Sequence, residues 1–69
     1  MERSSENSAM VELLARVEAE YREMPGLNLT VSQAERLWRL DSHTCALVLK
    51  LLNERRVLRR TTNGSYLRN

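Results

Sequence analysis

"VLRRTTNGSYLR", residues 57–68, is the stretch that decides the fold. Two runs rich in β-forming residues and arginine flank Asn63-Gly64, and Asn-Gly favours a two-residue type I′ turn because both central positions need a positive φ. We therefore expect a β-hairpin over residues 57–68 in which Arg59 lies directly opposite Arg68. Opposed like charges are unfavourable unless an anion bridges them. This pairing favours a phosphate partner, and the alternative is that both side chains point into water.

Upstream of the hairpin, the first helix is predicted from an apolar stripe at three- and four-residue spacing. The stripe consists of Met10, Leu13, Leu14, Val17, Tyr21 and Met24. Ser8 is a suitable N-cap for this helix, and Pro25-Gly26 ends it because proline cannot continue a helix. Residues 1–8 show no periodicity, so we expect a disordered tail over 1–8 and one folded domain over 9–69.

Two shorter helices are expected between this helix and the hairpin. Thr30-Val31-Ser32-Gln33 forms a capping-box pattern that begins a helix running to about Arg39. Its inner side is expected to carry Val31, Ala34, Leu37 and Trp38. Asp41 or Ser42 then caps a third helix, residues 42–55, with an inner stripe of Cys45, Val48, Leu49 and Leu52. The segment Leu27–Leu29 is a candidate third strand beside the hairpin.

The order of these elements resembles that of a known family. The stretch "LTVSQAERLWRLDSHTCALVLKLLNERRVLRRTTNGSYLR", residues 29–68, is similar to the core of small bacterial winged helix-turn-helix domains. The resemblance implies a mainly α fold with a small β-wing, in which three helices are followed by a C-terminal hairpin. It further implies a recognition helix over 42–55 that enters the DNA major groove and a wing over 57–68. A bacterial transcriptional regulator, or an accessory DNA-binding subunit, is the corresponding function.

The charge distribution agrees with an anionic partner. The net charge of the chain is +2, but residues 1–29 carry six Glu against three Arg, a net of −3. Residues 30–69 carry eight Lys and Arg against three acidic residues, a net of +5. A basic half of this kind favours binding to a polyanion, and nucleic acid is the commonest one. The alternative is a solvated surface that only keeps the protein soluble.

Under the DNA-binding hypothesis, the candidate contacts divide by position. The exposed start of the third helix is expected to meet base edges, through Ser42, His43 and Thr44. Cationic side chains are expected to meet phosphates; these are Arg36, Arg39, Lys50, Arg59, Arg60 and Arg68. Ser32 shares a polar helix face with Arg36 and Arg39, and Asn63 is expected at the tip of the wing. Double-stranded DNA is the expected partner.

A protein-interaction role is the alternative, because fold does not fix function. The start of the third helix lacks Arg, Asn and Gln, the residues that make bidentate base contacts. Leu47 lies off the inner stripe, and Glu54 would repel a nearby phosphate. An adaptor of winged-helix fold would bind its partner through helix 9–24, which has an acidic outer face, or through the Leu47 side of helix 42–55. Helix 9–24 is also the candidate surface for a homodimer, and the alternative is a solvated helix face.

Catalysis is not expected. His43 and Cys45 are two residues apart on a helix, so they point to different sides and cannot form a nucleophile–base pair. Cys45 is the single cysteine, and it is interpreted as a small core residue, so neither a disulfide nor a cysteine-based metal site is predicted. No cofactor is predicted, and no apolar run is long enough for a membrane span. These features favour a cytoplasmic protein.

Overall fold

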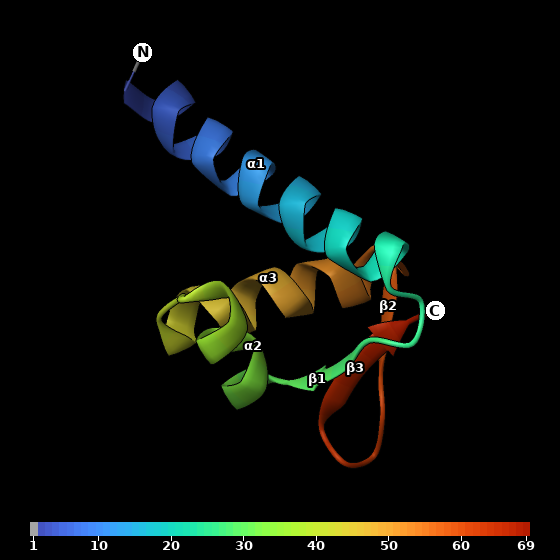
Figure 1. Ribbon diagram of the computed structural model, residues 1–69. Helices are drawn as coiled ribbons and strands as arrows, with labels where there is room; N and C mark the ends of the chain where they lie inside the picture. The colour runs from blue at the N-terminus through green and yellow to red at the C-terminus, as the bar shows by residue number, and fades with distance from the viewer. Residues whose placement is uncertain (1) are drawn as a thin grey trace.

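The computed structural model describes the backbone of residues 2–69 and the side chains of residues 9–69. Within this part of the chain lie three helices: α1 (Glu2–Glu23), α2 (Val31–Trp38) and α3 (Ser42–Glu54). Strands β1 (Asn28–Thr30), β2 (Leu58–Arg60) and β3 (Ser65–Arg68) form one antiparallel sheet in the order β1-β3-β2. The loop between β2 and β3 projects beyond the helices (Figure 1). The expected fold class, a mainly helical domain with a β-wing, is confirmed. The candidate strand Leu27–Leu29 corresponds to β1, which covers Asn28–Thr30.

Helix α1 begins earlier than the sequence pattern predicts. The predicted tail covered residues 1–8, with Ser8 as the N-cap, yet the backbone is helical from Glu2; Met1 lies outside the described residues. Residues 2–8 contain neither proline nor glycine, and extending an existing helix costs much less than nucleating one. The helix therefore continues past its packed portion, and its N-terminal half stands away from the rest of the molecule (Figure 1).

The short helices begin at the residues that the sequence indicates. The capping box of α2 is complete: the Gln33 N–H donates to Thr30 Oγ1 at 3.2 Å, and the Thr30 N–H donates to Gln33 Oε1 at 3.0 Å. Asp41, rather than Ser42, is the N-cap of α3, because its carboxylate accepts from the Thr44 N–H at 3.0 Å. Both starts therefore follow from local side-chain hydrogen bonds.

The ends of α2 and α3 carry arginine in a conformation that usually belongs to glycine. Arg39 has a φ of 55° and Arg56 a φ of 65°, and both follow a helix directly or after one residue. After α3, the Arg56 N–H donates to the Asn53 carbonyl at 3.0 Å and the Val57 N–H donates to the Leu52 carbonyl at 2.9 Å. These two bonds define a Schellman motif, in which glycine is the usual left-handed residue. Arginine at this position costs about 1 kcal/mol of backbone strain.

The core lies where α1, α2 and α3 meet the inner face of the sheet. All four residues of the predicted inner stripe of α3, Cys45, Val48, Leu49 and Leu52, are fully buried. They pack with Leu14, Val17 and Tyr21 of α1, Ala34 and Trp38 of α2, and Leu58 and Tyr66 of the hairpin.

Two predictions about the core region were wrong. Leu37 is 51% exposed, because at about 100° per residue it lies too far round the helix from Ala34 and Trp38 to share their face. Met24 is 44% exposed because α1 has ended at Glu23. The Trp38 side chain is buried as predicted, and its Nε1 has no acceptor among the described residues.

The hairpin forms over the predicted residues with a different turn. Only Gly64 in the loop has a positive φ, of 85°, so the type I′ turn is wrong. The Gly64 N–H donates to the Thr61 carbonyl at 3.0 Å, and the Thr61 N–H donates to the Ser65 carbonyl at 2.8 Å. This geometry is a three-residue loop with glycine in a bulge. The hydroxyl groups of Thr61 and Ser65, 2.9 Å apart, add a side-chain bond that favours this register.

A buried hydrogen bond attaches the sheet to the first helix. The Tyr21 hydroxyl of α1 donates to the Tyr66 carbonyl of β3 at 2.9 Å, and these residues are 45 positions apart in the chain. Tyr21 is 1% exposed, and its ring lies against that of Trp38, with centroids 6.2 Å apart and planes tilted by 57°. Burial, and secondarily the neighbouring Cys45, raise the pKa of Tyr21 to about 12. Tyr21 therefore connects α1, α2 and the hairpin.

Candidate nucleic-acid interface

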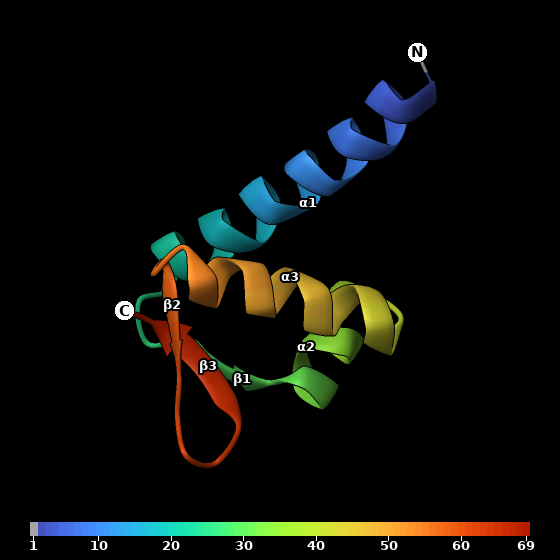
Figure 2. The same ribbon diagram turned by 180° about the vertical axis from the view of Figure 1, so that it is seen from behind.

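The outer face of α3 is the centre of the candidate interface. Its inner stripe faces the core, so the opposite side of the helix exposes Ser42, His43 and Lys50. His43 and Lys50 are seven residues apart, or about two turns, and so lie nearly in line along the helix. Figure 2 shows this side of α3 with α2 behind it.

Two charged features limit the part of α3 that can meet a phosphate. Thr44 is half-buried, and its N–H donates to the Asp41 carboxylate, which lowers the pKa of Asp41. The Asp41 carboxylate therefore lies at the start of α3, where it would repel a phosphate. Glu54 is exposed at the C-terminal end of the same face and would repel phosphate there. The usable face is thus the first two or three turns of α3.

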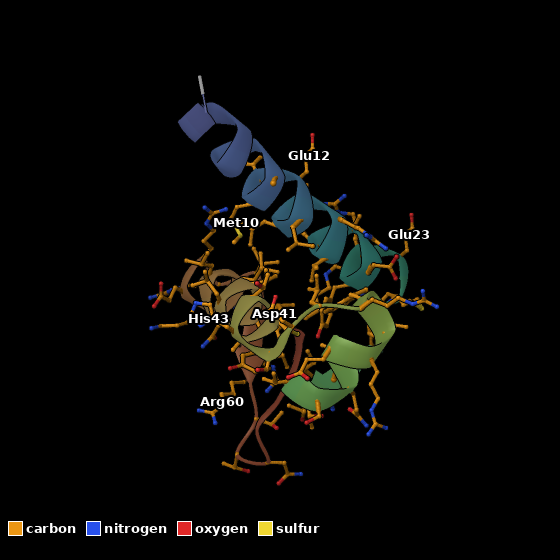
Figure 3. All side chains as sticks on the ribbon, turned by 90° about the vertical axis from the view of Figure 1, so that its left-hand side faces the viewer. Met10, Glu12, Glu23, Asp41, His43 and Arg60 are labelled. Carbon is orange, nitrogen blue, oxygen red and sulfur yellow. The ribbon has the colours of Figure 1, made fainter. Side chains whose placement is uncertain are left out.

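The wing, residues 57–68, adds cations on both faces of its ribbon. Successive residues of a strand point to opposite faces, so Arg59 and Arg60 diverge. Arg60 points to the same side of the molecule as His43 (Figure 3). Asn63 is exposed at the tip of the wing. Arg60 is therefore the wing arginine that extends the exposed face of α3.

Arg59 and Arg68 do not lie opposite each other in the hairpin as predicted. In the observed register Arg59 pairs with Leu67, and Arg68 pairs with Leu58. The three-residue loop shifts the strands by one position relative to the expected pairing, which moves one of the two arginines to the other face. The expected pairing of Arg59 with Arg68 is therefore wrong, and it no longer supports a phosphate partner. Both remain exposed, on opposite faces of the ribbon.

Helix α2 presents its polar residues elsewhere. Ser32 and Arg36 are exposed and lie one turn apart, as predicted. Arg39 does not continue their face, because α2 ends at Trp38 and Arg39 is left-handed. Since α2 and α3 bury their apolar sides against each other, their exposed faces diverge. These α2 residues therefore lie beside the outer face of α3 and are not part of it.

Acidic side chains lie on the other side of the molecule. Glu12 and Glu23 of α1 point away from the side that carries His43 and Arg60 (Figure 3). Both glutamates are exposed. These two glutamates of α1 therefore lie apart from the surface that carries His43 and Arg60.

The single cysteine, Cys45, is buried in the core. The Cys45 thiol is fully buried and lies 3.7 Å from the Val31 carbonyl. Burial raises the pKa of this thiol, with smaller contributions from the carboxylates of Glu35 and Asp41. Such a thiol is protonated and a poor nucleophile. His43, in contrast, is exposed on the other side of the helix.

Two arginines that the sequence analysis did not single out lie close to Arg68. Arg22 of α1 and Arg56 of the α3–β2 turn line the same hollow as Arg68, at the base of the wing. The only local signal is the Arg55-Arg56 pair, which follows the last residue of α3. No local pattern could have joined residues 22, 56 and 68, because the fold brings them together.

Comparison with family models, with curated proteins and with solved structures found no significant match to this chain. None of the helices in the described part of the chain is long and apolar enough to cross a membrane. Functional arguments therefore depend on the geometry of the exposed side chains.

Proposed function

We propose that this protein binds double-stranded DNA without catalysis, in the manner of a winged helix-turn-helix domain. The observation that carries the proposal is the common side shared by the outer face of α3 and the wing, where His43 and Arg60 point the same way. In this proposal α3 enters the major groove and the wing follows the adjacent backbone. A cytoplasmic bacterial transcriptional regulator, or an accessory DNA-binding subunit, is the corresponding role.

The proposed contacts differ in what they contribute. Lys50 and Arg60 are cations and contact phosphates, which fixes the position of the protein without reading sequence. Ser42 and His43 stand at the start of α3 and reach base edges. Arg36, Arg39 and Arg59 flank this surface and contribute through the electrostatic field more than through contact. Because hydroxyl groups and one imidazole bond to several bases, modest sequence preference is expected.

Single charge reversals test the proposal. Fluorescence anisotropy measures the binding of a labelled random duplex of about 20 base pairs at roughly 50 mM salt. Lys50→Glu and Arg60→Glu should each weaken binding about tenfold or more, since an attractive phosphate contact becomes repulsive. Arg16→Glu on α1 is the matched control, because Arg16 is exposed on α1 and the substitution changes the net charge equally. The control should change affinity by less than about threefold.

Equal weakening by Lys50→Glu, Arg60→Glu and Arg16→Glu would contradict the proposed orientation, because it would indicate a dependence on net charge alone. Absence of binding by the unaltered protein at low salt would contradict DNA binding itself.

A second candidate function, a protein-interaction adaptor, is favoured by three exposed apolar side chains. Leu47 on α3 is 36% exposed, Leu37 on α2 is 51% exposed and Val11 on α1 is 62% exposed. An adaptor would use the Leu47 side of α3 or the outer face of α1, and the latter face would also serve a homodimer. The adaptor predicts a partner that is retained after nuclease treatment and lost on Leu47→Glu. If Leu47→Glu abolishes DNA binding and no nuclease-resistant protein partner is found, the adaptor function is contradicted.

A further inference from the structure

Three arginines from distant parts of the chain line one hollow at the base of the wing. Arg22 comes from α1, Arg56 from the α3–β2 turn and Arg68 from the end of β3, and they surround a hollow of about 270 Å³. The one side-chain carboxylate in its wall, that of Glu18, pairs with Arg22 at 3.3 Å. No other ion pair occurs among the residues whose side chains are described. Among the side chains of residues 9–69, the guanidinium groups of Arg56 and Arg68 therefore have no carboxylate within 4.0 Å.

The wall of this hollow is held together by hydrogen bonds. The Asn69 side-chain amide donates to the Arg56 carbonyl at 3.1 Å, and the Asn69 N–H donates to the Val57 carbonyl at 3.1 Å. Tyr21, which also lines the hollow, bonds through its hydroxyl to the Tyr66 carbonyl at 2.9 Å. Both ends of the hairpin and α1 therefore meet at this point (Figure 1).

Arg56 stands at a position where glycine would fit without strain. Its φ of 65° is the left-handed conformation of a Schellman motif, and arginine adopts it less readily than glycine does. The Schellman turn places Arg56 at the same hollow as Arg22 and Arg68. A bound anion would offset the mutual repulsion of the guanidinium groups.

We propose that this hollow binds a phosphoryl group. Guanidinium groups present planar forks of N–H donors that match phosphate oxygens. Arg56 and Arg68 supply two such groups, and Arg22, which also pairs with Glu18, supplies a third; such a set suits a tetrahedral anion, whereas a planar carboxylate offers only two oxygens. A volume of about 270 Å³ holds a phosphate or a small phosphorylated molecule, and it lies just below the range of about 300–1,000 Å³ for drug-sized ligands.

The hollow is separate from the proposed DNA-reading face. It lies beyond the C-terminal end of α3, whereas Ser42 and His43 lie at the N-terminal end, about 20 Å away along a helix of 13 residues. An anion that bridges α1 and both ends of the hairpin would brace the wing against α1. The inference does not depend on DNA binding, and the two can fail separately.

A phosphate titration of the full chain, followed by backbone amide NMR, tests the proposal. Inorganic phosphate should give saturable shifts at the amides of Arg56, Val57 and Asn69, and chloride at matched ionic strength should not. Arg56→Gly removes the guanidinium group while suiting the left-handed backbone, and it should weaken phosphate binding about tenfold, the loss expected for one charge-assisted hydrogen bond. Arg68→Gln, which leaves the turn unaltered, should do the same.

Arg39→Gly is the matched control for Arg56→Gly. It makes the same substitution at the other left-handed arginine, which does not line the hollow, and it should leave phosphate binding unchanged. Equal weakening by Arg39→Gly and Arg56→Gly would overturn the proposal. Shifts that rise without saturation, or that are spread over all the arginines, would also overturn it.

A second arm identifies where the phosphoryl group comes from. If phosphate still saturates the hollow after a duplex has been added, the site takes a free phosphate or a small phosphorylated molecule. If the duplex displaces phosphate, and Arg56→Gly lowers the salt dependence of DNA binding by about one phosphate contact, the site takes a DNA backbone phosphate. If the hollow does not bind phosphate, this proposal fails. The DNA-binding proposal is still tested separately by Lys50→Glu and Arg60→Glu.

Discussion

Replacing Tyr21 by phenylalanine isolates the hydrogen bond that attaches the hairpin to α1. The substitution keeps the ring that packs against Trp38 at a centroid separation of 6.2 Å. It removes only the hydroxyl that donates to the Tyr66 carbonyl at 2.9 Å. The Tyr66 carbonyl then loses a buried donor, which costs about 1–1.5 kcal/mol of unfolding free energy. In a domain of this size, that loss should lower Tm by roughly 5–10 °C.

The same substitution should change the alkaline stability of the protein. Folding raises the pKa of Tyr21 from 10.0 to about 12, so the folded state retains a proton that the unfolded state loses between these pH values. This contribution to stability is complete below pH 10 and is lost as the pH rises through 12. Two pKa units correspond to about 2.7 kcal/mol. Because Tyr21 also borders a hollow open to water, about 1–2 kcal/mol is the expected loss.

Urea unfolding followed by tryptophan fluorescence measures both effects. Trp38 is the single tryptophan and is 5% exposed, so its emission reports unfolding of the core. The free-energy difference between the two proteins should be about 1–1.5 kcal/mol at neutral pH, and it should shrink towards zero near pH 12. The raised pKa of the Cys45 thiol also lowers alkaline stability, but Cys45 is present in both proteins and cancels in the difference.

Two results would refute this reasoning. If Tyr21→Phe and the unaltered protein differ by less than about 0.5 kcal/mol at neutral pH, the hydroxyl does not anchor β3. If their stabilities fall in parallel between pH 10 and pH 12, Tyr21 is not the group whose proton is retained on folding.

Three further predictions concern the backbone and the core. Gly64→Ala should lower the free energy of unfolding in urea by about 1–2 kcal/mol. The cost comes from the φ of 85° alone, because an added Cβ would meet nothing closer than Arg60 Nη2 at 3.9 Å. An unchanged stability would contradict the bulged loop. Arg39→Gly should stabilise the fold by about 0.5–1 kcal/mol in the same assay, and a destabilisation would show that the Arg39 side chain has a packing role. The buried Cys45 thiol should react with a thiol reagent only through unfolding, so its rate should rise with urea; a fast reaction in native buffer would contradict its burial.

The features predicted correctly from the sequence are those set by residues close together in the chain. The capping box of Thr30 and Gln33 and the inner stripe of α3 follow from spacing and local hydrogen bonds, and both are found in the structure. The existence of the hairpin follows from Asn63-Gly64 in the same way.

The hairpin register was not predictable from Asn-Gly alone. The dipeptide fits both a two-residue and a three-residue loop, and the bonds between Thr61 and Ser65 select the second. Since a shift of one residue moves side chains to the other face, this small difference separated Arg59 from Arg68. The left-handed conformations of Arg39 and Arg56 could not be predicted from the sequence either, because glycine is the usual signal for such positions.

The candidate site was predicted in part. The exposed residues of α3 follow from helical periodicity: Ser42, His43 and Lys50 are exposed as predicted, whereas Thr44 is half-buried. Two features depend on packing between distant segments. One is the common side of His43 and Arg60, and the other is the hollow lined by residues 22, 56 and 68. Such contacts are set by the whole core rather than by any local pattern.

The salt dependence of DNA affinity tests the central claim most directly. Each phosphate that a cation neutralises should contribute about −0.9 to the slope of log K against log salt concentration. For the unaltered protein we predict a slope between about −2 and −5, and we predict that Lys50→Gln and Arg60→Gln each reduce its magnitude by about 0.9. A slope near zero, or a slope that neither substitution alters, would contradict the claim that α3 and the wing together contact the DNA backbone.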